Sequence, residues 1–227
     1  MISKNYLDVV YDQKEKPFTT YPKKLVEHLM RKFNIENNSK VLDVCCGRGE
    51  FINEFINLGL EGHGVDINDN AKKHFPALNL KLADLEKDKL PYNDNEFDIV
   101  FNKSVVEHFL NPEKIIKECF RVLKPGGIII TMTPSWEHNL KNFYDDFTHK
   151  QPFNLVSIVD LHKTSNFSQV KADYFIQLPE LWKSDIFSKI LYLISFLTRI
   201  FVTDTLKKYS KFVFFSKEVM ILCSAKK

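Results

Sequence analysis

The chain has 227 residues, of which 44% are hydrophobic, and its 32 basic and 29 acidic side chains leave a formal net charge of +3. A chain of this length buries a large core without disulfides to hold it together. The balanced charge and the presence of only four arginines argue against a dedicated nucleic-acid-binding protein.

The cysteines and the N-terminal segment both favour a cytoplasmic protein. Cys45, Cys46, Cys119 and Cys223 show no disulfide-framework spacing, so we expect free thiols in a reducing compartment. Residues 1–18 lack the continuous apolar run of a secretory signal.

Strand-like and helix-like patterns alternate along residues 20–132. In chain order they predict a helix over 21–33, a strand over 41–45, a helix over 50–58 closed by Gly59, a strand over 61–67, a helix after Asn68, strands over 80–85 and 97–101, a helix from Asn111 through Leu123, a turn at 125–127 and a strand over 128–132. Repeated strand–helix–strand units imply a mostly parallel sheet with helices on both faces.

The second half is less regular. Residues 133–153 mix Pro, Trp, Asp, His and other aromatics without a clear period, and insertions of this kind often carry function. A helix over 156–164 and strands over 168–178 and 216–227 follow. The apolar segment 186–202 contains Lys189 and Arg199, which argues against a spanning helix; its interpretations are burial in the core or a homodimer interface, or peripheral contact with the inner membrane surface.

The stretch VLDVCCGRGEF at 41–51 has the residues of a tight bend after a strand. Neighbouring cysteines on a strand point in opposite directions, and no CxxC or nearby histidine completes a metal site. Gly47 and Gly49 permit a close backbone approach to a ligand, and the helix that follows offers free N–H groups. Ile52 stands where a dinucleotide fingerprint needs its third glycine, which disfavours NAD or FAD.

Five stretches in this order resemble the successive motifs of class I S-adenosylmethionine (SAM)-dependent methyltransferases: VLDVCCGRGEF, GVDIN at 64–68, LADLE at 82–86, FDIVFNKSVVEHF at 97–109 and RVLKPGGIIIT at 121–131. The resemblance implies an α/β, Rossmann-like, doubly wound seven-stranded sheet, mostly parallel with the last strand antiparallel. We expect a single domain over 1–227, with an N-terminal helix and cover over 1–38 and substrate-covering insertions over 134–165 and 179–216.

The same resemblance implies the cofactor residues by position. Asp43 and residues 47–49 would face the methionine part of SAM, Asp66 the ribose hydroxyls, and Asp84 with Leu85 the adenine. The full set is Asp43, Cys45, Gly47, Gly49, Asp66, Ile67, Asp84, Leu85, Asn102, Lys103 and His108. Cys45 replaces the first glycine of the family's loop, so the backbone there is expected to approach SAM less closely.

The candidate catalytic residues lie in NFYDDFTHKQPF at 142–153. His149 is the candidate general base, with Asp146 or Asp145 to orient its ring or bind substrate hydroxyls; the alternative is a structured loop without catalytic residues. We expect no metal, because Glu107 and His108 are adjacent and should face different sides, and Ser104 stands where metal-binding relatives carry a further acid.

DDFTHKQPF, with TPSW before it and QLPELW after it, also resembles methyltransferases encoded with surface-polysaccharide biosynthesis. This predicts O-methylation of a sugar, nucleotide-sugar or phosphoryl-linked intermediate of capsule or lipopolysaccharide. The alternatives are a lipid-linked or quinone-like small-molecule acceptor, a non-catalytic SAM-binding scaffold, and a nicotinamide oxidoreductase.

Overall fold

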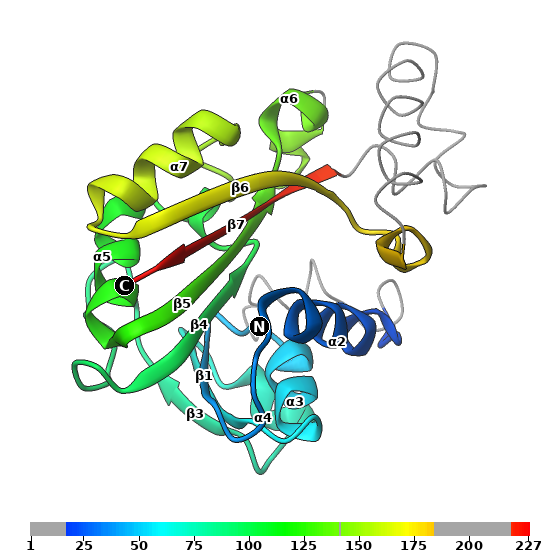
Figure 1. Ribbon diagram of the computed structural model, residues 1–227, viewed down its shortest axis with the longest axis vertical. Coiled ribbons are helices and arrows are strands. Elements are labelled where there is room, and N and C mark those ends of the chain that lie inside the picture. Colours follow the sequence, from blue (N-terminus) through cyan, green and yellow to red (C-terminus); the bar gives the residue numbers. More distant parts are fainter. Residues whose placement is uncertain (1–16, 141, 184–218) are drawn as a thin grey trace, which may run out of the picture.

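The computed structural model describes residues 17–140, 142–183 and 219–227, and these contain a seven-stranded sheet of order β3-β2-β1-β4-β5-β7-β6 (Figure 1). The strands are β1 (Lys40–Val44), β2 (Glu61–Asp66), β3 (Asn79–Leu82), β4 (Phe97–Lys103), β5 (Leu123–Pro134), β6 (Ser168–Ile176) and β7 (Val219–Lys226). The first five pair in parallel, and β7 is antiparallel to both β5 and β6. The predicted fold class is therefore confirmed.

Helices cover both faces of this sheet. On one face α2 (Tyr21–Phe33), α3 (Glu50–Asn57) and the short α4 (Asn70–His74) pack on one hydrophobic cluster, and on the other α5 (Pro112–Val122) and α7 (Leu155–Thr164) pack on a second. The strands between them carry buried side chains toward both clusters, which explains the near-continuous apolar runs in the sequence.

Most predicted elements are confirmed, and the differences have local causes. β3 ends at Leu82, so residues 83–85 leave the sheet and reach the cavity described below. β5 begins at Leu123 and contains the predicted turn as an irregularity, with Gly126 at φ +80° and a register shift against β4. Residues 133–153, which showed no period, form the end of β5 and the single turns α6 (Trp136–Asn139) and η2 (Phe143–Asp145).

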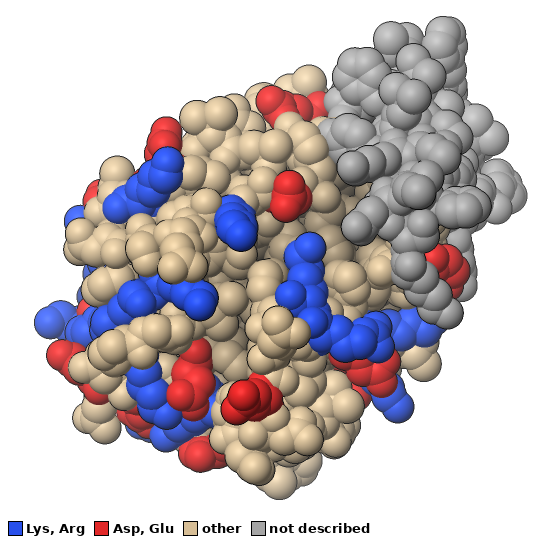
Figure 2. Space-filling view, viewed as in Figure 1, with Lys and Arg blue, Asp and Glu red and all other residues tan. Residues whose placement is uncertain are grey.

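Two expectations concern residues that the structure does not describe. One is the role of the apolar segment 186–202, and the other is the part of the N-terminal cover formed by residues 1–16. Among the described residues, no helix combines the length and apolar character needed to cross a bilayer. On the face seen in Figure 2, lysine and arginine are interspersed with aspartate and glutamate, as the balanced composition predicts.

A buried polar network joins α7 to the sheet through His162. Its Nδ1 donates to the carbonyl oxygen of Ile158 at 2.8 Å, and its Nε2 lies 3.0 Å from the hydroxyl of Thr131, which also accepts from Asn102 Nδ2. The neutral imidazole therefore satisfies both of its nitrogens. Because the ring is fully buried, desolvation lowers the pKa of His162 to about 4.

We predict that His162 makes the fold acid-sensitive. In the unfolded chain His162 is protonated below its pKa of 6.5, whereas in the folded protein it stays neutral down to about pH 4. Its contribution to the free energy of unfolding is therefore complete above pH 6.5 and falls as the pH drops from 6.5 toward 4. The loss reaches about 3 kcal/mol. Urea unfolding at about pH 7 and pH 4.5 should show a smaller drop for His162→Gln than for the wild type. Equal drops in the two proteins would contradict this assignment.

Candidate functional site

A cavity of about 700 Å³ opens at the carboxyl ends of β1, β2 and β4, a volume suited to a small molecule. Nine of the predicted cofactor residues line it: Asp43, Cys45, Gly47, Asp66, Ile67, Asp84, Leu85, Lys103 and His108. Gly49 and Asn102 do not. Ligands of open α/β sheets bind at this edge, where the strand order reverses.

The bend after β1 uses three residues with left-handed backbone. Cys45 and Gly47 have φ +55°, and Gly49, the N-cap of α3, has φ +80°. Cys45 thus adopts the conformation that glycine would, at a cost of about 1–2 kcal/mol. A Cβ at Gly47 would meet no atom within 4 Å, whereas one at Gly49 would lie 2.8 Å from Leu78 Cδ1. Gly47 therefore leaves open space at the cavity, and Gly49 allows the bend to pack on the core.

Asp66, the last residue of β2, binds the bend directly. Its Oδ2 accepts a hydrogen bond from the N–H of Gly47 at 2.8 Å, and its Oδ1 accepts from the N–H of Asn68 at 3.2 Å. The carboxylate thus fixes both loops while it lines the cavity. Burial raises the pKa of Asp66, and the N–H groups of Gly47, Asn68 and Ile67 oppose that shift.

Asp43, on β1, is a buried acid with unused binding capacity. Its side chain is 3% exposed, and its Oδ2 has no hydrogen-bond partner among the described residues. Burial, followed by the charge of Asp66, raises its pKa well above the usual range, while Lys103 acts in the opposite direction. Two carboxyl groups lining one cavity favour a ligand that carries positive charge and hydrogen-bond donors.

Lys103 and Asn102 are neighbours on β4, so their side chains point to opposite faces of the sheet. Lys103 lines the cavity, with its Nζ 5.5 Å from the ring centroid of Phe51. Asn102 faces the other side of the sheet and donates to Thr131. Asp84 accepts a hydrogen bond from Lys87 Nζ at 2.7 Å, which lowers the pKa of its carboxyl group. Leu85 is 5% exposed and gives the cavity an apolar wall.

At the other end of the cavity, His108 is held by a chain of hydrogen bonds from the 142–153 loop. Its Nδ1 lies 2.9 Å from Thr148 Oγ1, and the Thr148 hydroxyl donates to Asp146 Oδ1 at 2.6 Å. His108 follows β4 in the 3₁₀ turn η1 (Val106–His108), and Thr148 and Lys150 line the same end. Burial lowers the pKa of His108 to about 4, so its imidazole is neutral near pH 7.

The candidate base His149 lies behind this end and does not line the cavity. Its Nδ1 is 2.5 Å from the carbonyl oxygen of Phe143, and its ring centroid is 4.8 Å from that of His108. Asp145 is exposed, and its Oδ2 accepts a hydrogen bond from Asn142 Nδ2 at 3.0 Å. The structure therefore brings together His108, Asp146 and His149, and leaves Asp145 at the surface.

Sequence reasoning missed Glu107 as a site residue. It is fully buried, its Oε2 accepts from Thr133 Oγ1 at 3.0 Å, and its backbone carbonyl accepts from the N–H groups of Lys150 and Gln151. Burial raises the pKa of Glu107 to about 7. The adjacency argument for Glu107 and His108 is wrong: one ligand atom from each of them and one from His149 lie within 4.8 Å of one another.

Lys150 and Glu86 are among the cavity-lining residues that were also missed. Lys150 Nζ forms a 2.8 Å ion pair with Glu86 Oε1, and this pair joins the 142–153 loop to the segment after β3. The signal that could have indicated Glu107 was an acid beside a histidine between apolar residues, in VVEHF. Nothing in the sequence pairs Lys150 with Glu86, 64 residues earlier in the chain.

Comparison with known proteins agrees with this geometry. Residues 42–131 match a family model described as a methyltransferase domain. Demethylmenaquinone methyltransferase of Staphylococcus epidermidis is 32% identical over 120 residues, which are 48% of this chain and 48% of that protein. The chain thus matches about half the length of this curated relative.

Solved structures share the whole fold. A SAM-dependent methyltransferase from Archaeoglobus fulgidus superposes with a TM-score of 0.66 at 23% identity, covering 98% of this chain and 100% of that one. Phosphoethanolamine N-methyltransferase 2 of Haemonchus contortus, solved with phosphomonomethylethanolamine and S-adenosylhomocysteine, gives a TM-score of 0.63 at 17% identity, with 100% and 60% coverage. Residues 42–131 thus match a methyltransferase domain, in a chain that has the class I methyltransferase fold.

Proposed function

We propose that the whole chain transfers the methyl group of SAM to a hydroxyl of a small-molecule acceptor. When bound, SAM supplies an electrophilic methyl group on a positively charged sulfur. One observation carries the proposal: the buried Oδ2 of Asp43 has no hydrogen-bond partner among the described residues. The carboxyl group of Asp43 lines the cavity together with that of Asp66. An ammonium group and a ribose diol are suitable partners for these two carboxylates.

Each part of the cavity would hold one part of the cofactor. Asp43 would bind the ammonium group, Asp66 the ribose hydroxyls, and Asp84, Leu85 and Ile67 would flank the adenine. Gly47 would allow the cofactor to approach the backbone, because the space beyond its Cα is open. Alignment of donor and acceptor, and exclusion of water, then supply much of the rate.

The acceptor would enter at the end lined by His108, Thr148 and Lys150. We propose that His149, whose ring packs against that of the cavity-lining His108, helps to activate the acceptor hydroxyl through His108, and that Asp146 orients His108 through Thr148. Asp145 is exposed, so we assign it at most a contact with acceptor groups that extend to the loop surface.

Hydroxyl, ammonium and imidazole groups at this end favour a polyhydroxylated or nucleotide-linked acceptor, and we propose an intermediate of surface-polysaccharide synthesis. A quinone-like acceptor is the second candidate. It is favoured by the relatives named demethylmenaquinone methyltransferase, which match this chain over about half of their length. Phe109 at the same end of the cavity suits a planar ring.

The carboxylate of Asp66 is expected to be essential for SAM binding. Replacing Asp66 by Ala removes the carboxylate that fixes Gly47 and would bind the ribose, so SAM affinity measured by calorimetry should fall at least about 30-fold, equivalent to two hydrogen bonds. Asp69→Ala is the matched control, because Asp69 is the N-cap residue of α4, its side chain makes no capping hydrogen bond, and it does not line the cavity. Equal SAM affinities for the two variants would contradict the ribose assignment.

The two glycines of the bend should respond differently. Gly47→Ala places a methyl group in open cavity space, so it should weaken SAM binding about tenfold or more while costing only the left-handed strain of about 1 kcal/mol. Gly49→Ala should cost about 2–3 kcal/mol of unfolding free energy, because strain and the contact with Leu78 add. Urea unfolding and SAM calorimetry of both variants check this. A greater loss of stability in Gly47→Ala would disprove it.

Methyl transfer itself is tested with labelled SAM and two acceptor pools, one of nucleotide-sugars and oligosaccharides and one of quinones. A product heavier by one methyl group identifies the acceptor class. With that acceptor, His149→Ala should lower turnover about 100-fold or more with SAM affinity unchanged. His138→Ala, in the same insertion but outside the cavity, should keep full turnover. SAM binding without transfer to any pool would instead support a scaffold.

A further inference from the structure

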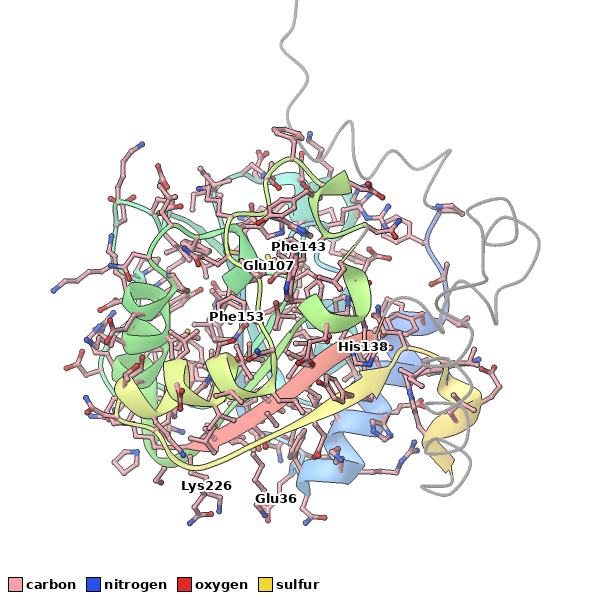
Figure 3. All side chains as sticks on the ribbon, turned by 90° about the horizontal axis from the view of Figure 1, so that it is seen from above. Glu36, Glu107, His138, Phe143, Phe153 and Lys226 are labelled. Atoms are coloured by element: carbon pink, nitrogen blue, oxygen red, sulfur yellow. The ribbon has the colours of Figure 1, made fainter. Side chains whose placement is uncertain are left out.

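Three potential ligand atoms converge behind the acceptor end of the cavity. They belong to Glu107 and His108 in η1 and to His149 in the loop after η2, and all lie within 4.8 Å of one another. Figure 3 labels Glu107 beside Phe143, the residue whose carbonyl oxygen holds the ring of His149. The cluster exists only because the 142–153 loop folds back onto η1, where Lys150 and Gln151 donate to the carbonyl of Glu107.

The carboxylate in this cluster is only half satisfied. Glu107 is 0% exposed, and its Oε2 accepts from Thr133, whereas its Oε1 has no hydrogen-bond partner among the described residues. A buried carboxylate oxygen without a donor costs free energy unless a cation or a proton compensates it. Glu107 thus offers one oxygen to a cation.

Both histidines present a nitrogen lone pair instead of a proton. Thr148 gives its hydroxyl proton to Asp146, so the Nδ1 of His108 must be the donor to Thr148 Oγ1. The Phe143 carbonyl can only accept, so the Nδ1 of His149 also carries its proton. In the neutral imidazoles Nε2 is therefore the basic atom of each ring.

We propose that Glu107, His108 and His149 bind one divalent metal ion of the zinc type. Two imidazole nitrogens and one carboxylate oxygen match the ligand preference of Zn²⁺, Co²⁺ or Fe²⁺ better than that of Mg²⁺, which takes oxygen ligands. Three protein ligands leave a fourth position open, as in catalytic zinc sites. Of the three ligands His108 lines the cavity, so an acceptor that occupies the fourth position would reach it past His108.

The surroundings of the three side chains are those of a metal site. Each imidazole uses its second nitrogen on a protein acceptor, Thr148 for His108 and the Phe143 carbonyl for His149, and the second carboxylate oxygen of Glu107 is held by Thr133. Such partners fix the tautomer and the orientation of metal ligands. The same bonds give each side chain one defined direction.

A metal ion here would also define the role of His149. An acceptor hydroxyl at the open position would lose its proton to solvent at a lower pH than in water. Its oxygen would then form the new C–O bond as the C–S bond of SAM breaks, with the electron pair remaining on sulfur. His149 would serve as a ligand, and the metal would supply the activation otherwise assigned to the imidazole as base.

The test is metal binding by the full chain without an affinity tag. Calorimetry with Zn²⁺ should show one ion per chain, and Co²⁺ should give visible absorption bands. Glu107→Gln, His108→Gln and His149→Gln should each weaken Zn²⁺ binding about 100-fold or more, and Thr148→Val about tenfold, as expected for an outer partner. His138→Gln is the matched histidine control and should bind Zn²⁺ as the wild type does.

SAM titration of the same samples separates misfolding and the proposed function from the metal site. His149 does not line the cofactor cavity, so His149→Gln should keep its SAM affinity while losing Zn²⁺. The wild type binding no Zn²⁺ or Co²⁺, or His149→Gln binding Zn²⁺ as tightly as His138→Gln, would overturn the proposal.

Discussion

The site depends on the carboxylate of Asp66, which accepts the N–H of Gly47 with one oxygen and the N–H of Asn68 with the other. These two bonds connect the loops that follow β1 and β2, so two neighbouring strands hold one shared ligand surface. The left-handed residues at the bend are strained or entropically costly on their own. The buried carboxylate compensates for that cost and keeps the backbone of Gly47 open to the cavity.

The same arrangement places two carboxyl groups in one cavity, which favours a ligand that carries positive charge. Asp43 and Asp66 both line the cavity, and burial raises both pKa values because the ionised carboxylates are poorly solvated there. Lys103 offsets only part of this. A cofactor with an ammonium group and a ribose diol supplies hydrogen-bond donors to both acids, whereas the pyrophosphate of a dinucleotide offers none to Asp43. Fold and charge thus lead to the same cofactor.

Sequence patterns were sufficient for the parts of the molecule that follow local rules. Apolar spacing located the helix over 21–33 and the strands that carry Asp43 and Asp66, and the glycines located the bend, because each follows from periodicity or backbone conformation. The roles of the two acids came from the resemblance to the methyltransferase family. Asn102 was assigned to the cavity by its position in the motif that resembles the methyltransferase family, but side chains alternate along a strand, so it faces Thr131 instead. The cluster of Glu107, His108 and His149 depends on how a non-periodic loop folds back, which no spacing rule encodes.

The central claim is that the carboxylates of Asp43 and Asp66 bind S-adenosylmethionine, and a crystal structure with S-adenosylhomocysteine tests it most directly. The account predicts ribose hydroxyls bonded to Asp66 Oδ atoms and the ammonium group bonded to Asp43 Oδ2. Nucleoside density at any other place, or an empty cavity at saturating ligand, would contradict it.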